Sequence, residues 1–264
     1  MKKILRLLGL FILNTKLNIA KQMEYRFNFV LTSIIALIFS SISPLLQYLI
    51  FTQTKGFPGW NLDQIILFQG VLLIVLGLQS LLFGELQWFI SNLIWRGELD
   101  RLLLKPYPPI GIILASGFSL NSTGSILAGI AITVYSVLKM QLSIGFLQIA
   151  LFLVYIAVGV ILTMSLHVLF SCMVIVLVRL GRMDEIFGFL SRFGEYPIDI
   201  YSNALKFIFT TAVPFAVWAY IPSKVLLGVL DVSMIYSLIC TILFFLGSLK
   251  LWNICLKKYS SAGG

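Results

Sequence analysis

Long apolar runs separated by short polar stretches dominate this chain. Runs that are nearly free of charge, and long enough for a bilayer-crossing helix of about 20 residues, fall at 27–51, 65–83, 110–137, 143–178 and 233–252. Their polar residues are mostly Ser and Thr, whose side chains can hydrogen-bond to their own helix. The pattern therefore predicts an all-α membrane protein in which each run forms a transmembrane helix.

A further crossing between the last two runs can be placed in two ways. Hydropathy alone favours a helix at 204–221. The alternative places the helix at 184–200 and makes 201–227 a re-entrant pair of half-helices, broken at Pro214 and Pro222. Proline is tolerated at membrane depth where the surrounding protein satisfies the freed backbone groups. Either placement predicts about six transmembrane helices.

The first 26 residues have the pattern of an amphipathic helix. Apolar positions share one side and polar positions another, namely Leu5, Leu8, Ile12, Ile19 and Met23 against Lys3, Asn14, Asn18 and Lys21. Six basic residues and a single acid favour a helix lying in the cytoplasmic interface of the membrane. A cleaved signal peptide is disfavoured, because Arg6 interrupts the apolar core and no small-residue cleavage site follows it.

The densest cluster of mixed charge lies between the second and third runs, at 84–109. It contains Glu85, Arg96, Glu98, Asp100, Arg101 and Lys105. Such charges are costly in hydrocarbon, so this segment lies outside the bilayer or at its surface. Leu-rich blocks beside the charges predict a short helix with one apolar and one charged side, ended before Pro106. The segment fits a docking surface, and a simple solvated loop is the alternative.

Composition agrees with the membrane class. The chain is 59% hydrophobic and 11% charged, against about 25% charged residues in soluble domains. A net charge of +9 is explained by the excess of Lys and Arg on the cytoplasmic side, which argues against nucleic acid as a partner and makes membrane lipid an expected one. Three cysteines in or beside apolar runs predict neither a disulfide framework nor a metal site.

Three short motifs resemble those of the ABC-2 family of transporter permeases. Residues 97–106 read GELDRLLLKP, which is similar to the Gly-x-Leu-Asp-x-x-Leu-x-(Lys/Arg)-Pro element that follows the second span in six-helix bacterial export permeases without a fused ATPase. Residues 196–201 read YPIDIY and precede the two proline sites of the re-entrant segment. Residues 257–263 read KKYSSAG, like the Arg-x-Tyr-x-Ser-x-Gly ends of such chains.

The resemblance implies a complex rather than a lone chain. Such permeases pair with an identical or a paralogous permease and bind two cytoplasmic ATP-binding subunits. Segment 84–109 would then be the coupling helix, with docking contacts from Trp95, Arg96, Glu98, Asp100 and Arg101. The resemblance also favours the re-entrant arrangement near Pro214 and Pro222, and a bacterial inner membrane as the location. The distribution of Lys and Arg along the chain places both termini in the cytoplasm.

The sequence contains no phosphate-binding loop of the form Gly-x-x-x-x-Gly-Lys-(Ser/Thr), so ATP and Mg²⁺ would be bound by the partner subunit. We expect no catalytic, cofactor or metal residues in this chain. Gln47, Gln69 and Gln79 are candidates for lining a substrate path, because they are polar points within apolar runs. An ATP-independent secondary transporter, a membrane-embedded lipid enzyme and a membrane scaffold are the alternative functions. The near absence of intramembrane charge weighs against the first of these.

Overall fold

The structure is a computed structural model that describes residues 26–54, 56–177 and 183–259, together with scattered helical positions between 9 and 24. The long helices are α2 (Arg26–Gln53), α3 (Leu62–Phe83), α7 (Thr123–Lys139), α8 (Phe146–Leu177) and α12 (Val232–Lys258). The short helices are α4 (Leu86–Trp95), α5 (Leu99–Leu103), α6 (Pro109–Ala115), α9 (Met183–Ser191), α10 (Asn203–Phe207) and α11 (Tyr220–Leu226). Among the described residues there is no strand, which confirms the predicted all-α fold.

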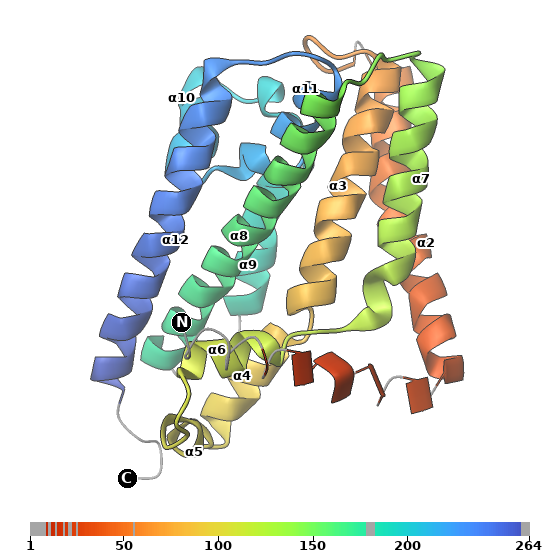
Figure 1. The fold of residues 1–264 in the computed structure, drawn as a ribbon. Helices are drawn as coiled ribbons and strands as arrows, with labels where there is room; N and C mark the ends of the chain where they lie inside the picture. The colour runs from red at the N-terminus through yellow and green to blue at the C-terminus, as the bar shows by residue number, and fades with distance from the viewer. Residues whose placement is uncertain are drawn as a thin grey trace.

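Five helical stretches of the described chain are long and apolar enough to cross a membrane. They are Arg26–Gln53, Leu62–Trp95, Leu120–Lys139, Phe146–Val176 and Val232–Lys258. Figure 1 shows the five long helices running between an upper and a lower end of the bundle, with α4, α5 and α6 at the lower end. The chain is therefore a multi-pass membrane protein.

Two packed helix groups make up the bundle. One group is α2, α3 and α7, in which α3 packs along α7, and the other is α8, α11 and α12. The groups meet where α3 contacts α8 and α11. Much of α3 is buried, whereas apolar side chains of α2 and α12 point outward, as expected for helices that face lipid.

Glycines allow α3 and α7 to approach closely. A Cβ atom at Gly129 of α7 would lie 2.7 Å from the backbone nitrogen of Ile74 and 2.8 Å from the carbonyl oxygen of Gly70 on α3. Gly124 faces α2 instead, where a Cβ atom would lie 2.9 Å from the carbonyl oxygen of Ser33. Small residues at helix contacts are the usual device for close packing in membranes, and here they fit α7 against both of its neighbours.

The predicted third span, 110–137, is not one helix. Residues 110–115 belong to α6, the chain is extended at Ser119, and only α7 continues towards the upper end. The break is stabilised at the junction of α3 and α4. The backbone N–H of Glu85 donates to Gly117 (3.1 Å), and the N–H of Ser119 donates to Leu81 (2.8 Å). In a continuous helix the N–H of Glu85 would donate to the carbonyl of Leu81. Here both groups bond to the linker instead, and a hydropathy pattern does not predict such long-range hydrogen bonds.

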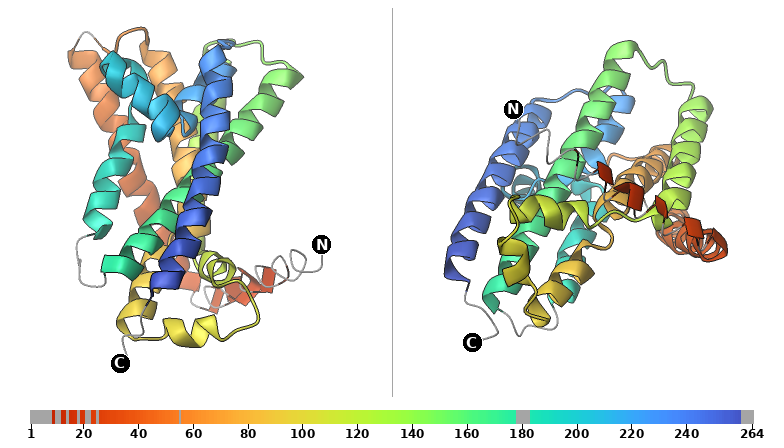
Figure 2. Two further views of the ribbon diagram at one scale, coloured as in Figure 1. Left: turned by 90° about the vertical axis from the view of Figure 1, so that its left-hand side faces the viewer. Right: turned by 60° about the horizontal axis from the view of Figure 1, so that its bottom comes forward.

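Neither placement of the fifth crossing forms one continuous helix. Segment 184–200 divides into α9, a 3₁₀ turn η2 (Arg192–Glu195) and a 3₁₀ turn η3 (Ile198–Ile200). Segment 204–221 divides into α10, a π-helical turn η4 (Ile208–Ala212), a 3₁₀ turn η5 (Phe215–Val217) and the start of α11. In Figure 1 and in the left view of Figure 2, the chain from α10 to α11 stays in the upper part of the bundle and leads back to the upper end, where α12 begins. This course is that of a re-entrant segment.

Only one of the two prolines breaks the helix in this segment. Pro214 lies between η4 and η5, outside both. Pro222 is the third residue of α11, in the first turn, where a missing N–H costs no intrahelical hydrogen bond. The second break lies at Ala219, with φ −133° and ψ −33°, so the expectation of a break at Pro222 is corrected.

Most of the predicted N-terminal helix, 1–26, falls outside the described residues. The described positions before α2 are helical, and Ile12, Leu13 and Leu17 are exposed there.

Candidate docking segment and transmembrane path

The charged segment 84–109 folds as two short helices, α4 and α5, joined by a tight turn at Gly97. The N–H of Gly97 donates to Ile94 (3.1 Å), and the N–H of Glu98 donates to Leu93 (2.9 Å). This pair of bonds is a Schellman motif, which ends a helix with a residue in the left-handed region. Gly97 takes that conformation with φ +65°. The turn therefore has a defined geometry and is not a loose loop.

One face of this helix pair is anchored in the bundle. Leu86, Ile90 and Leu93 of α4 are buried, as are Leu99 and Leu102 of α5. They pack in one cluster with apolar residues of α6, α8 and α12, including Ile113, Val168, Phe170, Ile175 and Trp252. Burial of this face holds the pair against the lower ends of three other helices.

The opposite face is exposed and carries the predicted docking residues. Trp95, Arg96, Glu98 and Arg101 are at least partly exposed, and Asp100 is partly buried and takes part in an interaction within the protein. Trp88 belongs to the same surface and was not among the residues predicted from the sequence. It precedes Trp95 by two helical turns, and the exposed fractions of the two side chains are 67% and 64%. The spacing of seven between two tryptophans was the available signal for one shared face.

A second candidate feature is a series of cavities along α3. The upper cavity, of about 400 Å³, lies between α2, α3 and α7. The middle cavity, of about 340 Å³, shares Pro44 and Gln69 with the upper one. The lower cavity, of about 230 Å³, shares Leu76 and Ser80 with the middle one and reaches Gly84 and Gln87 at the lower end. Shared walls make the three cavities a candidate path along most of the length of α3.

Two of the three predicted path residues, Gln69 and Gln79, line these cavities, and the third, Gln47, is hydrogen-bonded to Gln69. Gln69 lies between the upper and middle cavities, and Gln79 lines the lower one. Gln47 is 1% exposed and bonds to Gln69, which is 2% exposed, with 2.6 Å between Gln69 Nε2 and Gln47 Oε1. Gln47 Nε2 in turn donates to the backbone oxygen of Glu195 (3.0 Å). The pair thus joins α2, α3 and the segment that follows α9.

Serine hydroxyls give the middle cavity its polar character. Five serines contribute to its wall, namely Ser40, Ser43, Ser80, Ser122 and Ser125. Some of them bond across helices, with Ser125 donating to Ser40 over 3.2 Å and Ser122 donating to Ser80. These serines therefore serve both the packing of the helices and the polar lining of the cavity.

A third polar cluster closes the upper end. Asp199 of η3 accepts hydrogen bonds from Trp60 (2.8 Å), from Tyr220 (3.3 Å) and from Lys206 (3.4 Å). The ammonium of Lys224 lies 4.8 Å from the centre of the Trp60 ring, within the range of a cation–π contact. Burial, followed by the nearby Asp199 carboxylate, raises the pKa of Tyr220, so its phenol stays a donor. The cluster ties the loop before α3 to both limbs of the re-entrant segment.

These features define a helical membrane protein with an anchored, charged segment at one end and a line of cavities along α3. A family model described as "ABC-2 family transporter protein" matches residues 37–263. The chain therefore belongs to the ABC-2 transporter family and is the membrane component of a transporter. Neither the curated proteins nor the solved structures contain a significant match to it.

Proposed function

We propose that this chain is the permease subunit of an ATP-driven exporter, with the α4–α5 pair docking on a cytoplasmic ATP-binding subunit. The observation that carries the proposal is the two-sided helix pair. Its apolar face is fastened to α6, α8 and α12, and its other face presents Trp88, Trp95, Arg96 and Arg101 to solvent. A rigid body with interleaved charges is suited to docking in a fixed orientation.

The proposal includes a route by which docking reaches the cavities. The linker between α6 and α7 is hydrogen-bonded into the junction of α3 and α4 through Glu85 and Ser119. Displacement of α4 and α5 would therefore move α3 and α7 together, and these two helices form walls of the upper cavity. ATP and Mg²⁺ would be bound by the partner, so the chain would convert a partner's closure into a change in its own path.

The remaining parts of the proposal concern the assembly. Two ATP-binding subunits would serve two permeases, and the second permease would be an identical or a paralogous chain. The lower end would face the cytoplasm of a bacterial inner membrane, with both termini on that side. Basic residues at this end support the orientation, with Arg96, Arg101 and Lys105 in the docking segment and Lys257 and Lys258 at the end of α12.

Co-purification of the tagged chain from its native membranes tests docking. We expect the wild-type chain to retain a subunit that carries a phosphate-binding loop and hydrolyses ATP. Arg101→Glu should lose most of that subunit, because it reverses an exposed charge on the docking face. Lys257→Glu is the matched control, since Lys257 is exposed at the same end of the bundle but outside the docking segment.

Normal yield of all three chains without any ATP-binding subunit would contradict the proposal. That result would favour an ATP-independent transporter or a membrane scaffold as the function of this chain. Equal loss of the subunit in both variants would show dependence on overall charge and would contradict the assignment of the docking face.

A further inference from the structure

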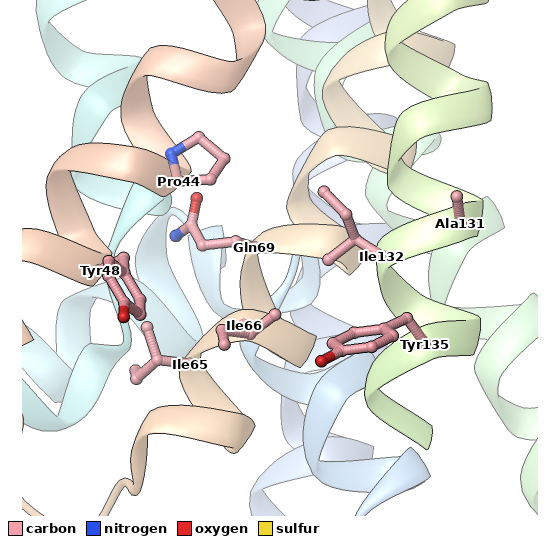
Figure 3. A pocket seen from close by; sticks show the side chains of 8 residues that line it. All are labelled: Pro44, Tyr48, Ile65, Ile66, Gln69, Ala131, Ile132 and Tyr135. Carbon is pink, nitrogen blue, oxygen red and sulfur yellow. The ribbon is translucent and has the colours of Figure 1, made fainter. Parts of the chain in front are cut away.

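The upper cavity is a largely apolar slot whose lining includes the amide of Gln69 and the phenols of Tyr48 and Tyr135. Figure 3 shows α2 on one side with Pro44 and Tyr48, α7 on the other with Ile132 and Tyr135, and α3 between them. Ile65, Ile66 and Ala131 complete the apolar lining. Leu45 and Leu49 of α2, and Val134 and Leu138 of α7, are exposed on the outside of the bundle beside the cavity. The slot therefore lies next to a lipid-facing surface, and apolar material is what its walls accept.

The hydrogen bonds that join Gln69, Gln47 and Glu195 behind this wall have a fixed direction. The backbone oxygen of Glu195 can only accept, so it turns Nε2 of Gln47 towards itself. Oε1 of Gln47 must then face Gln69 and accept from its Nε2. Oε1 of Gln69 is therefore the last acceptor in this series of hydrogen bonds, and it is buried without a hydrogen-bond partner in the structure. A buried acceptor of this kind costs about 1–3 kcal/mol, and a donor on a bound molecule would offset that cost.

The middle cavity on the other side of Gln69 has a different character. Its wall carries five serine hydroxyls, and Pro44 removes the N–H that would otherwise bond to the carbonyl of Ser40. Glu195 is the ionisable residue in the wall, and its side chain is partly buried. These groups suit a polar, uncharged head group that can both donate and accept hydrogen bonds.

We infer that the upper and middle cavities together form a binding site for an uncharged amphiphile, with its alkyl chain in the upper cavity, its hydroxylated head group in the middle cavity and a hydroxyl donating to Oε1 of Gln69. An anionic head group would lie beside the Glu195 carboxyl without a matching positive charge, which is costly at membrane depth. A cationic head group is the competing class, and the trimethylammonium competitor in the test below separates the two. The inference rests on the proposed function only in naming this amphiphile class as the exported substrate. Binding itself requires this chain alone.

Photolabelling in lipid nanodiscs tests the site on the full chain without any partner. The probe is an alkyl β-glucoside that carries a diazirine on its chain, and labelled residues are mapped by mass spectrometry. We expect labels to concentrate on the segments of α2, α3 and α7 that line the upper cavity. An excess of the plain alkyl glucoside should compete, whereas an alkyl sulfate and an alkyltrimethylammonium of the same chain length should not.

Three variants locate the effect. Gln69→Leu should weaken competition by the glucoside about tenfold, the equivalent of one hydrogen bond to a buried acceptor. Ile66→Trp fills the upper cavity and should abolish the concentrated labelling. Leu127→Trp is the matched control, because this α7 residue points out of the bundle with an exposed fraction of 67%, and it should label like the wild-type chain.

Labels spread evenly over the lipid-facing helices would overturn the inference, as would unchanged competition in both Gln69→Leu and Ile66→Trp. Competition by the trimethylammonium compound would overturn the uncharged class and favour a cation paired with Glu195. Because no ATP-binding subunit is present, success here combined with failed co-purification would refute docking and leave the binding site standing. The reverse pair of results would refute the site alone.

Discussion

The indole Nε1 of Trp60 donates a 2.8 Å hydrogen bond to Oδ2 of Asp199, across 139 residues of sequence. Lys206 and Tyr220 reach the other carboxylate oxygen at 3.4 and 3.3 Å. One acidic side chain therefore connects the loop before α3, the end of α10 and the start of α11. The re-entrant segment, which lacks a continuous helix, depends on such contacts for its position.

Asp199→Ala should destabilise the chain by about 1–3 kcal/mol, because three donors lose their shared acceptor. Thermal unfolding in detergent would measure the change. Asp63→Ala is the control, since its pair with Lys139 (2.6 Å) is largely exposed and should be worth less than about 1 kcal/mol. Equal destabilisation by the two substitutions would show that Asp199 has no special structural role.

Gly129→Ala should force α3 and α7 apart. The new methyl group would meet backbone atoms of Gly70 and Ile74 at 2.7–2.8 Å, and backbone cannot rotate away as a side chain can. We expect a clear loss of thermal stability and a changed volume of the upper cavity, whose walls include both helices.

Gly247→Ala provides the matched control for that experiment, because a Cβ atom there meets nothing within 4 Å. Gly247 lies in α12, where the substitution should be neutral or slightly stabilising, since alanine favours a helix more than glycine does. A neutral result at both positions would contradict the close approach of α3 and α7.

Gly97→Ala should cost about 1 kcal/mol, because alanine is strained in the left-handed conformation that ends α4. No atom lies within 4 Å of the position that the new methyl group would take, so the cost comes from the backbone alone and not from a clash. Gly97→Asn should recover part of the loss, since asparagine tolerates this region better. Thermal unfolding would measure stability, and recovery of the ATP-binding subunit would report on the orientation of α5.

Trp88→Ala should weaken docking as much as Trp95→Ala, by about tenfold or more, because exposed tryptophans are common anchors of interfaces. Binding of the purified ATP-binding subunit to nanodiscs that hold each variant would measure the effect. Phe146→Ala at the start of α8 is the control, as it removes an exposed aromatic ring from the opposite end of the bundle. Unchanged affinity in both tryptophan variants would restrict the docking surface to the charged residues.

The membrane class, the approximate positions of α2, α3, α8 and α12, and the presence of a charged segment at one end followed from the sequence alone. Each of these depends on local composition, and the cost of charge in hydrocarbon makes composition a direct guide to depth. The proline before which α5 ends was equally visible, because it acts on its own backbone. The sequence predicted one short helix here, and its division into α4 and α5 at Gly97 was not predicted.

Only the tertiary structure decided where helices break and which polar groups meet. The division of 110–137 into two helices depends on hydrogen bonds between the linker and the α3–α4 junction. Pro222 lies within the first turn of α11 because the helix break falls earlier, at Ala219. The bond between Gln47 and Gln69 joins residues from two helices. The sequence shows each glutamine as a polar residue in an apolar run. Only the packing of the helices brought the two side chains together and left one amide oxygen without a partner. The free energy of a buried polar group depends on its neighbours in space, which the sequence does not show.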